Sequence, residues 1–415
     1  MGYTLARQVL RRHYTITGRL FMAIKYIDQL DLKGKKVLIR VDYNVPYDKE
    51  MNITDDTRIT ATLPTIRHCL DAGAVVILIS HLGRPKGKVV DKMSLKPVAV
   101  RLSEVTGKTV KFIDSPIGDG AKEAAASLQP GDIALLENIR FYPEEEKNDE
   151  AFGKKLSELG DVYINDAFAT AHRGHASNEA ITRYAKENAA GFLLKNEIEY
   201  FKKALFEPER PLIAVIGGAK VSTKIDALQN ILDRVDALLI GGGMAFTFLK
   251  AKGYSVGNSL LEEDLIDSAK EILGNAKDKG VQIILPVDIV ASTAFDNDAE
   301  TRIVPADQIP DNMMGLDIGP ETIQQFNSVI STAKTVVWNG PMGAFEMPAF
   351  SKGTFDIAQG IADSPCLSII GGGDSVTAIN QSGLADRITY ISTGGGAFLE
   401  LLEGKKLPGI VSLDK

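Results

Sequence analysis

The sequence predicts an α/β protein made of two doubly wound parallel-sheet domains, and three observations support this fold class. The chain has 415 residues, which exceeds the length over which a single hydrophobic core keeps growing. Short apolar runs rich in β-branched residues alternate with helix-length segments throughout. These runs lack the polar–apolar alternation of a half-exposed strand, so we expect strands that are buried on both faces of parallel sheets.

The expected elements follow one another in a regular order. Strands are expected at residues 36–41, 74–80, 133–137, 161–166, 212–217, 237–242, 281–286, 335–340 and 367–372. The segment 191–211 has apolar residues at helical spacing and contains Pro208 and Pro211 at its end, where prolines stop a helix. We therefore expect a hinge helix in this segment, joining two domains that share a pattern of elements without an obvious sequence repeat.

The domain boundary should fall within or just after this helix. We expect an N-terminal domain at 22–195 and a C-terminal domain at 196–399. The first 21 residues carry four arginines and no acidic residue, which superficially suits an organelle transit peptide. Met22, however, opens a stretch typical of an ordinary domain start, so we interpret residues 1–21 as an upstream extension of doubtful role.

Charge and cysteine content argue against several classes of function. The formal net charge is −7, with 44% hydrophobic and 24% charged residues, which is typical of a globular protein and not of a nucleic-acid-binding domain. No apolar run approaches the roughly 20 residues that span a bilayer, so no membrane partner is expected. The two cysteines, Cys69 and Cys366, lack metal-ligand spacing and favour reduced thiols in a cytoplasmic protein.

Glycine clusters follow expected strands in the second half of the chain. They are VIGGAK at 215–220, LIGGGMAF at 239–246, LSIIGGGDSV at 367–376 and ISTGGGAF at 391–398. In an open parallel sheet, ligands bind beyond the carboxyl ends of the strands, where glycine lets backbone amides approach a phosphate. The P-loop and dinucleotide fingerprints are both absent. Tight packing of the turns could explain each cluster alone, but the four together predict a nucleotide site.

Three charged residues refine this prediction. Lys220 and Lys224 are four residues apart, so if their turn opens a helix both side chains would project from one face toward the phosphates. Asp374 follows three glycines and supplies a hard oxygen of the kind that Mg²⁺ takes together with phosphates. The alternatives are a solvated surface for the lysines and an N-cap for the aspartate.

Basic and polar side chains gather at the ends of the expected strands in the first half. They are Asp42, Asn44, Arg58, His81, Arg84, Arg140, His172, Arg173 and His175. Because a guanidinium fork pairs with phosphate and carboxylate, four loop arginines in an acidic protein predict a pocket for a small polyanion, although each alone could form a surface ion pair. Arg40 lies inside an expected strand, and we interpret it as structural. His172 and His175 have zinc-like spacing but no third ligand nearby.

Taken together, the motifs resemble those of the phosphoglycerate kinase family, from Lys25 to Leu413. They are RVDYNVP, SHLGRP, LLENIRF, NDAFATAHR, GGAKVS, GGGMAFTFL, LPVD, WNGPMGAFE, GGGDS and STGGGA, in the order expected for that family. The resemblance implies reversible phosphoryl transfer from 1,3-bisphosphoglycerate to Mg-ADP, giving 3-phosphoglycerate and Mg-ATP. It also implies a monomer, an active site in the cleft between the two domains and a C-terminal segment, 400–415, that returns to the N-terminal domain.

The resemblance also assigns residues by their positions in the motifs. The triose substrate would be held by Asp42, Asn44, Arg58, His81, Arg84, Arg140 and Arg173. The nucleotide would contact Lys220, Lys224, Glu346, Gly372, Gly373, Asp374 and Ser375, with Asp374 toward Mg²⁺. Arg58 and Lys220 would flank the transferring group as catalytic residues. A substrate carboxylate is already ionised at neutral pH, so positioning and charge neutralisation are needed and a general base is not.

Two other functions remain open on the sequence alone. A two-domain dehydrogenase would suit the sheets, but it needs a dinucleotide fingerprint that the glycine clusters do not provide. A non-catalytic phosphometabolite-binding protein of the same fold would bind phosphoglycerate without turnover. Binding and turnover measurements distinguish these alternatives from the kinase.

Overall fold

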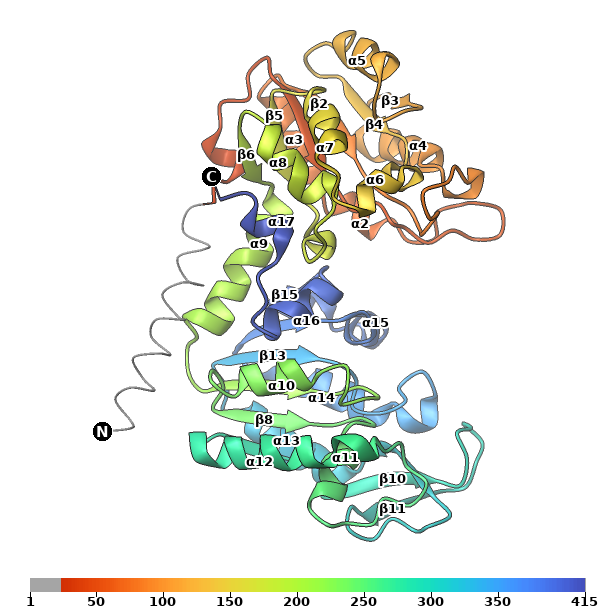
Figure 1. The fold of residues 1–415 in the computed structure, drawn as a ribbon. Coiled ribbons are helices and arrows are strands. Elements are labelled where there is room, and N and C mark those ends of the chain that lie inside the picture. Colours follow the sequence, from red (N-terminus) through yellow and green to blue (C-terminus); the bar gives the residue numbers. More distant parts are fainter. Residues whose placement is uncertain (1–23, 415) are drawn as a thin grey trace, which may run out of the picture. The chain divides into compact units, whose positions relative to one another are not determined.

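The chain divides into two compact units. The computed structural model describes residues 24–414, so the predicted extension at 1–21 lies outside the described residues. Unit 1 comprises the described residues up to Glu199 together with those from Lys406 onward, and unit 2 comprises Tyr200–Lys405. Elements carry the labels of Figure 1.

Unit 1 is built on a six-stranded parallel sheet. Its strands are β1 (Lys36–Arg40), β2 (Val75–Ile79), β3 (Val110–Ile113), β4 (Ile133–Leu136), β5 (Val162–Asn165) and β6 (Asn188–Ala190). The spatial order is β3-β4-β2-β1-β5-β6, and every neighbouring pair is parallel. The chain therefore starts at the centre, fills one edge of the sheet and then returns to fill the other, which is the doubly wound arrangement.

The helices of unit 1 connect these strands. They are α2 (Thr57–Thr60), α3 (Leu63–Asp71), α4 (Lys96–Thr106), α5 (Asp119–Ala126), α6 (Pro143–Glu146), α7 (Glu150–Ser157), α8 (Ile181–Tyr184), most of α9 (Phe192–Phe201) and α17 (Pro408–Val411). A π-helical turn at Ala176–Ala180, here called the π-turn, contacts α6, α7 and α8.

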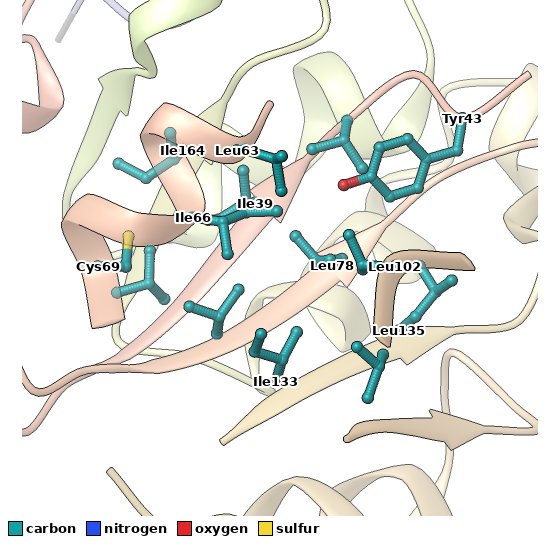
Figure 2. Packing of buried hydrophobic residues seen from close by; sticks show 14 of the residues in the cluster. Ile39, Tyr43, Leu63, Ile66, Cys69, Leu78, Leu102, Ile133, Leu135 and Ile164 are labelled. Carbon is teal, nitrogen blue, oxygen red and sulfur yellow. The ribbon is translucent and has the colours of Figure 1, made fainter. Parts of the chain in front are cut away.

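One face of this sheet packs against α3 and α4. Leu63, Ile66 and Cys69 recur every three residues along α3, so they lie on the helix face that meets the sheet. Figure 2 shows them directed toward residues of the sheet, among them Ile39 and Leu78. Complete burial of one such side chain contributes about 1.5–3 kcal/mol to folding, so this layer fixes the strand ends that carry the polar residues of unit 1.

Unit 2 contains a second six-stranded parallel sheet. Its strands are β7 (Leu212–Ile216), β8 (Ala237–Ile240), β9 (Gln282–Ile284), β13 (Thr335–Asn339), β14 (Leu367–Gly371) and β15 (Tyr390–Ile391), in the order β15-β14-β13-β7-β8-β9. The helices are α10 (Ile225–Ile231), α11 (Ala245–Ala251), α12 (Ile266–Lys279), α13 (Pro320–Ile330), α14 (Lys352–Asp363), α15 (Gly373–Ser382) and α16 (Gly396–Leu402). Each expected strand is present, and the two parallel-sheet α/β units confirm the predicted fold class.

Unit 2 also has a small antiparallel sheet that the sequence analysis missed. It consists of β10 (Asp288–Ser292), β11 (Thr301–Pro305) and β12 (Met314–Ile318), with β10 in the middle. The edge strand β11 is almost entirely exposed, so it has no apolar run to reveal it. Asp288 accepts hydrogen bonds from the backbone of Glu321 and Thr322 at the start of α13, which ties this sheet to the rest of the unit.

The predicted connecting helix is present but shorter than the segment 191–211. It begins at Phe192, and after Phe201 it continues only as a π-helical turn to Phe206. The backbone N–H of Leu194 donates to Asp166 Oδ1 at 3.1 Å, so a buried carboxylate of unit 1 satisfies the first turn. The backbone of Gly409 exchanges hydrogen bonds with Ala171 and Asn165, which anchors the C-terminal segment to unit 1.

Candidate active site

The polar residues of unit 1 come together at the carboxyl ends of its strands. Asp42 and Asn44 follow β1, His81 follows β2, and Arg140 lies in a short 3₁₀ turn after β4. The segment with Arg173 follows β5. In a doubly wound sheet this edge is where ligands bind, so the fold places these side chains where the sequence analysis expected a ligand.

Asp42 is the centre of the first group of contacts. The residue is 9% exposed, and its carboxylate forms an ion pair with Arg58 from α2. The other carboxylate oxygen, Oδ1, lies 3.7 Å from His81 Nδ1. Asn44 accepts a hydrogen bond from the backbone N–H of Gly83 at 2.8 Å, which links the loops after β1 and β2. The structure thus brings four of the predicted substrate residues into one contact network.

Arg140 is the most informative residue of this network. It is buried, and its Nη1 donates to the Gly83 carbonyl at 2.8 Å. Its Nε and Nη2 have no hydrogen-bond partner among the described residues, although Glu146 approaches Nε at 3.5 Å. Burial, together with the charges of Arg40 and Arg173, lowers the pKa of Arg140 to about 10. Buried donors without an acceptor are costly, and an anionic ligand would satisfy them.

Arg40, which the sequence analysis interpreted as structural, belongs to this network. It is fully buried and faces His81, with Nη2 3.2 Å from the imidazole Nδ1. Burial, followed by the charges of Arg40, Arg140, Arg173 and Arg58, lowers the pKa of His81 well below its ordinary value. The sequence did contain a sign of this role. Burying an arginine in an apolar strand is unfavourable unless its charge is paired or used, so Arg40 was a candidate for the site.

The remaining predicted residues of unit 1 are less tightly held. Arg173 is partly buried, and its Nε donates to His172 Nε2 at 3.1 Å. Its charge lowers the pKa of both His81 and Arg140. Arg84 is exposed, and the structure gives its side chain no contact with the other predicted residues. The edge of the sheet therefore carries a positive field with unsatisfied donors, which fits a small polyanion.

In unit 2, the glycine-rich turns after β7, β8 and β13 pack against one another. Gly340 has a φ of +97°, and a Cβ there would lie 2.2 Å from the carbonyl oxygen of Gly217. The Gly218 N–H donates to Pro341, and the Gly242 N–H donates to Met342. Tight packing, the alternative considered for single clusters, therefore accounts for the clusters at 215–220 and 239–246, which pack against the turn after β13. They form a rigid base at the carboxyl edge of the sheet.

Lys224 is built into this base. It is partly buried at the start of α10, and its ammonium donates to the Gly217 carbonyl at 2.7 Å and to Asn339 Oδ1 at 2.6 Å. Burial lowers its pKa to about 8, and the carboxylate of Asp374 opposes that shift. Asn339 also donates to the Gly371 carbonyl at 2.8 Å, so it ties Lys224 to the turn after β14. Asn339 was not among the predicted site residues.

The expectation that Lys220 and Lys224 share a helix face is wrong. The segment after β7 continues as turns until α10 begins at Ile225, so Lys224 points inward whereas Lys220 lies exposed in the preceding loop. Glu262 holds this loop, because its carboxylate accepts from the Ser222 backbone N–H at 3.0 Å and from the Ser222 hydroxyl. Lys220 thus has an exposed side chain on a loop that Glu262 braces.

The backbone at the start of α15 is open on the side of Gly373. Gly372 has a φ of +97°, and nothing lies within 4 Å of a Cβ placed on Gly373. No described residue accepts from the backbone N–H groups of Gly373, Asp374 and Ser375, which are the donors that a helix N-terminus offers to an anion. The Ser375 hydroxyl accepts from the Gly340 N–H at 2.6 Å and fixes this turn to the one after β13.

The donor set near α15 fits Mg²⁺ bound together with a nucleotide. Asp374 is exposed in the first turn, and no described residue hydrogen-bonds to its carboxylate. The described part of the chain has no group of three or more His, Cys, Asp or Glu side chains that could hold a metal alone. Mg²⁺ usually takes one or two carboxylates plus phosphate oxygens and water, so one free carboxylate is adequate when a nucleotide supplies the rest.

The family model for phosphoglycerate kinase matches residues 27–405. Curated relatives with that name are 55% identical over 394 residues in Geotalea uraniireducens and 55% over 395 residues in Geobacter metallireducens. In both comparisons the alignment covers 95% of this chain and 99% of the relative. The chain belongs to the phosphoglycerate kinase family.

Solved structures of phosphoglycerate kinases have the same fold. The structure from Coxiella burnetii has a TM-score of 0.88 at 43% identity, and the one from Pyrococcus horikoshii has 0.81 at 34%. Each alignment covers 94% of this chain and 98% of the other. Membership in the phosphoglycerate kinase family makes the protein a phosphotransferase that acts on 3-phosphoglycerate and ATP or ADP. Nothing in the comparisons favours the non-catalytic alternative.

Within residues 24–414, every helix is too short or too polar to cross a bilayer.

Proposed function

We propose that this protein transfers a phosphoryl group reversibly between 1,3-bisphosphoglycerate and Mg-ADP, with the triose held by unit 1 and the nucleotide by unit 2. The observation that carries this division is the state of Arg140. Two of its guanidinium nitrogens are buried without an acceptor inside a cluster of arginines. A doubly or triply charged phosphoglycerate supplies the acceptors and the negative charge that this cluster lacks.

The proposed triose site consists of the polar residues at the edge of the sheet in unit 1. They are Asp42, Asn44, Arg58, His81, Arg84, Arg140 and Arg173. The contacts among Asp42, Arg58 and His81 support this set, because they hold the side chains in place before a ligand arrives. The assignment of Arg84 to this site is supported only by its position in the sequence and by the exposure of its side chain.

The proposed nucleotide site lies over the base of packed turns in unit 2. It comprises Lys220, Lys224, Glu346, Gly372, Gly373, Asp374 and Ser375. The free N–H groups at the start of α15 suit phosphate oxygens. Lys224 supplies a positive charge from the packed turns, where its ammonium donates to the Gly217 carbonyl. We assign Mg²⁺ to Asp374. When bound, the ion neutralises charge on the nucleotide phosphates.

The chemistry requires little from the side chains beyond position and charge. In the ATP-consuming direction the nucleophile is the carboxylate of 3-phosphoglycerate, which is ionised at neutral pH because such groups titrate near pH 3.5–4. The transferred group carries its charge on three equatorial oxygens. Arg58 and Lys220 are the proposed catalytic residues, since an exposed lysine on a braced loop and an arginine oriented by Asp42 can meet that charge.

Transfer also requires the two units to bring their ligands together. We propose that they close during turnover with α9 as the hinge, which would exclude water from the reacting groups. We further propose that the protein is a cytoplasmic monomer. Sedimentation velocity that gives a dimer mass would contradict the monomer.

The deciding experiment is ATP consumption by the purified protein with Mg²⁺ and 3-phosphoglycerate, with the acyl phosphate trapped by a dehydrogenase and NADH loss recorded. Turnover should require both substrates and Mg²⁺. Lys220→Ala should lower kcat by roughly 10²–10³, the usual effect of removing one charge-stabilising donor. The matched control is Lys250→Ala, because Lys250 is an exposed lysine at the end of α11 whose side chain has no ion pair or hydrogen bond with another described residue. Binding without turnover would support the non-catalytic alternative.

A further inference from the structure

Four buried residues of unit 1 form a continuous chain of hydrogen bonds. Glu145 in α6 accepts from the Ser177 hydroxyl at 2.7 Å, and Ser177 lies in the π-turn. The Ser177 oxygen accepts from Arg40 Nε at 2.9 Å, and Arg40 Nη2 lies 3.2 Å from His81 Nδ1. Glu145, Ser177 and Arg40 have no solvent exposure, and His81 has 4%. Only His81 belongs to the proposed triose site.

The direction of each hydrogen bond in this chain follows from the chemistry of the groups. A guanidinium has donors and no acceptor, so Arg40 must donate at both of its contacts. The Ser177 hydroxyl has one hydrogen, which goes to Glu145 because a carboxylate only accepts. His81 Nδ1 therefore accepts from Arg40 and carries no proton. A neutral imidazole must then hold its proton on Nε2.

The alternative states of His81, with a proton on Nδ1 or on both ring nitrogens, fit the surroundings less well. Asp42 Oδ1 is the other group that faces Nδ1, and at 3.7 Å it is too distant for a hydrogen bond. A doubly protonated ring would add a fifth positive charge to those of Arg40, Arg58, Arg140 and Arg173, and burial also opposes it. Nε2 has no hydrogen-bond partner among the described residues, so its proton is available to a ligand.

Glu145, at the end of this hydrogen-bond chain, explains why Arg40 stays in place. Glu145 accepts from the Ser177 backbone N–H at 2.9 Å as well as from its hydroxyl. Burial alone would raise the pKa of Glu145, but the contacts with His175 and Ser177 and the charge of Arg40 lower it, so the carboxylate stays ionised. Arg40 also donates through Nη1 to the carbonyl of Val41. Each of the three guanidinium nitrogens of Arg40 thus has a partner in unit 1.

We propose that Glu145, Ser177 and Arg40 are positioning residues that fix His81 in the tautomer with its proton on Nε2. In this state His81 offers a donor to an oxygen of the triose substrate. The opposite tautomer would present a lone pair to an anion and repel it. The inference rests on the proposed assignment of His81 to the triose site, but the tautomer itself is a property of the free protein.

The first test is long-range ¹H–¹⁵N correlation NMR of the full-length protein with ¹⁵N-labelled histidine, with the His81 signals assigned from their loss in His81→Asn. Between about pH 6 and pH 8, where a free histidine titrates, we expect one unprotonated nitrogen at Nδ1 and one protonated nitrogen at Nε2. A proton on Nδ1, a rapidly exchanging mixture or a doubly protonated ring overturns the proposal. This measurement needs no variant that could fail to fold.

The second test asks whether the chain acts through His81. Ser177→Ala should convert the His81 signals to a tautomer mixture and raise the KM for 3-phosphoglycerate about tenfold, with the KM for ATP unchanged, because one ligand hydrogen bond is weakened. The control is Tyr163→Phe, since the Tyr163 hydroxyl donates to the backbone carbonyl of Ser177 and is equally buried. It should lower the melting temperature without changing the tautomer or either KM.

The outcomes separate this inference from the proposed function. If Ser177→Ala keeps both the tautomer and the KM, the positioning role is wrong even when the enzyme turns over normally. If 3-phosphoglycerate leaves the His81 signals of the wild-type protein unchanged at saturation, the assignment of His81 to the triose site fails instead, whatever the tautomer. Ser177→Ala could also raise the KM for 3-phosphoglycerate while His81 keeps its proton on Nε2. That result would contradict the positioning role as well, because the change in KM would not arise from the tautomer of His81.

Discussion

At the scale of single residues, two of the proposed site residues are held in states that lower the stability of the unliganded protein. Arg140 retains two buried donors without acceptors, and Lys224 retains an ammonium whose charge is disfavoured by burial. Each state costs free energy in the unliganded protein, since buried polar groups are normally satisfied and buried charges are normally paired. A phosphate bound beside either residue would recover that cost.

Arg140→Met should test whether the unsatisfied donors of Arg140 lower stability and serve to bind 3-phosphoglycerate. The variant keeps a long side chain but removes the orphaned donors, so we expect the KM for 3-phosphoglycerate to rise about 100-fold. The free energy of unfolding without ligand should stay equal or increase by about 1 kcal/mol, as measured by urea denaturation. Arg101→Met is the control, because Arg101 pairs with Asp56 on the surface and is absent from the site. A large loss of stability in Arg140→Met would show that the residue is structural.

Lys224 should make stability depend on pH in the alkaline range. Its pKa is about 8 in the folded protein against an ordinary value of about 10.4, so between these values the unfolded chain binds more protons. The free energy of unfolding should therefore gain roughly 2–3 kcal/mol from this group as pH rises from about 8 to 10.5. Lys224→Met should lack that gain in urea titrations at pH 7.5 and 10, whereas exposed Lys250→Met should keep it. An equal gain in Lys224→Met would exclude the lysine as its source.

At the scale of elements, a buried carboxylate holds the start of α9. Burial raises the pKa of Asp166 to about 7, while its Oδ1 accepts from the Leu194 N–H. Asp166 Oδ2 has no hydrogen-bond partner among the described residues. A Cβ on Gly191 would lie 2.3 Å from Asp166 Oδ1, so the carboxylate packs directly against the residue that precedes the helix.

Asp166→Asn should remove a pH dependence at this helix start. The folded pKa lies above the ordinary value near 3.9, so the contribution of Asp166 to stability is complete below about pH 4 and is lost as pH rises through about 7. The amide keeps an acceptor for Leu194 but does not titrate. Urea denaturation at pH 5 and pH 7.5 should therefore show a smaller loss of stability in Asp166→Asn than in the wild type. The same loss in both proteins would contradict the assignment.

The elements also show how much of the fold the sequence could predict. Strands such as β2 and β7 were predictable because they are fully buried runs of Val, Ile, Leu and Ala. β6 has the sequence NAA, and β15 has two residues, so neither carries a strand pattern. β11 was invisible because an exposed edge strand does not need apolar side chains. Pattern analysis thus found the strands that are long apolar runs and missed those that are very short, such as β6 and β15, or exposed, such as β11.

The candidate site divides in the same way. Residues at strand ends, such as Asp42 and His81, were predictable because parallel strands deliver their carboxyl ends to one edge. Arg40 was set aside because its neighbours form an apolar strand, and Glu145 and Ser177 lie in short helical turns without a motif. Their role depends on tertiary contacts among β1, α6 and the π-turn, which no local pattern encodes.

At the scale of the whole molecule, the proposed binding of the triose by unit 1 and of the nucleotide by unit 2 predicts separate effects of the two ligands. 3-Phosphoglycerate alone should slow amide hydrogen exchange in the loops of unit 1 that contain His81 and Arg140, because a bound anion orders the side chains that those loops present. Mg-ATP alone should slow exchange in residues 217–224 and at the start of α15 in unit 2. Hydrogen-exchange mass spectrometry of the full chain reports both regions in one experiment.

Arg140→Met provides the control that makes this prediction strict. It should abolish the effect of 3-phosphoglycerate on unit 1 and leave the effect of Mg-ATP on unit 2 intact, since the unpartnered donors of Arg140 lie in unit 1. With both ligands present, slowed exchange should extend to α9, because closure about this helix would restrict its fraying. Protection of unit 1 by the nucleotide alone would reverse the proposed roles. Protection of α9 by one ligand would show that closure does not need the complete pair of substrates.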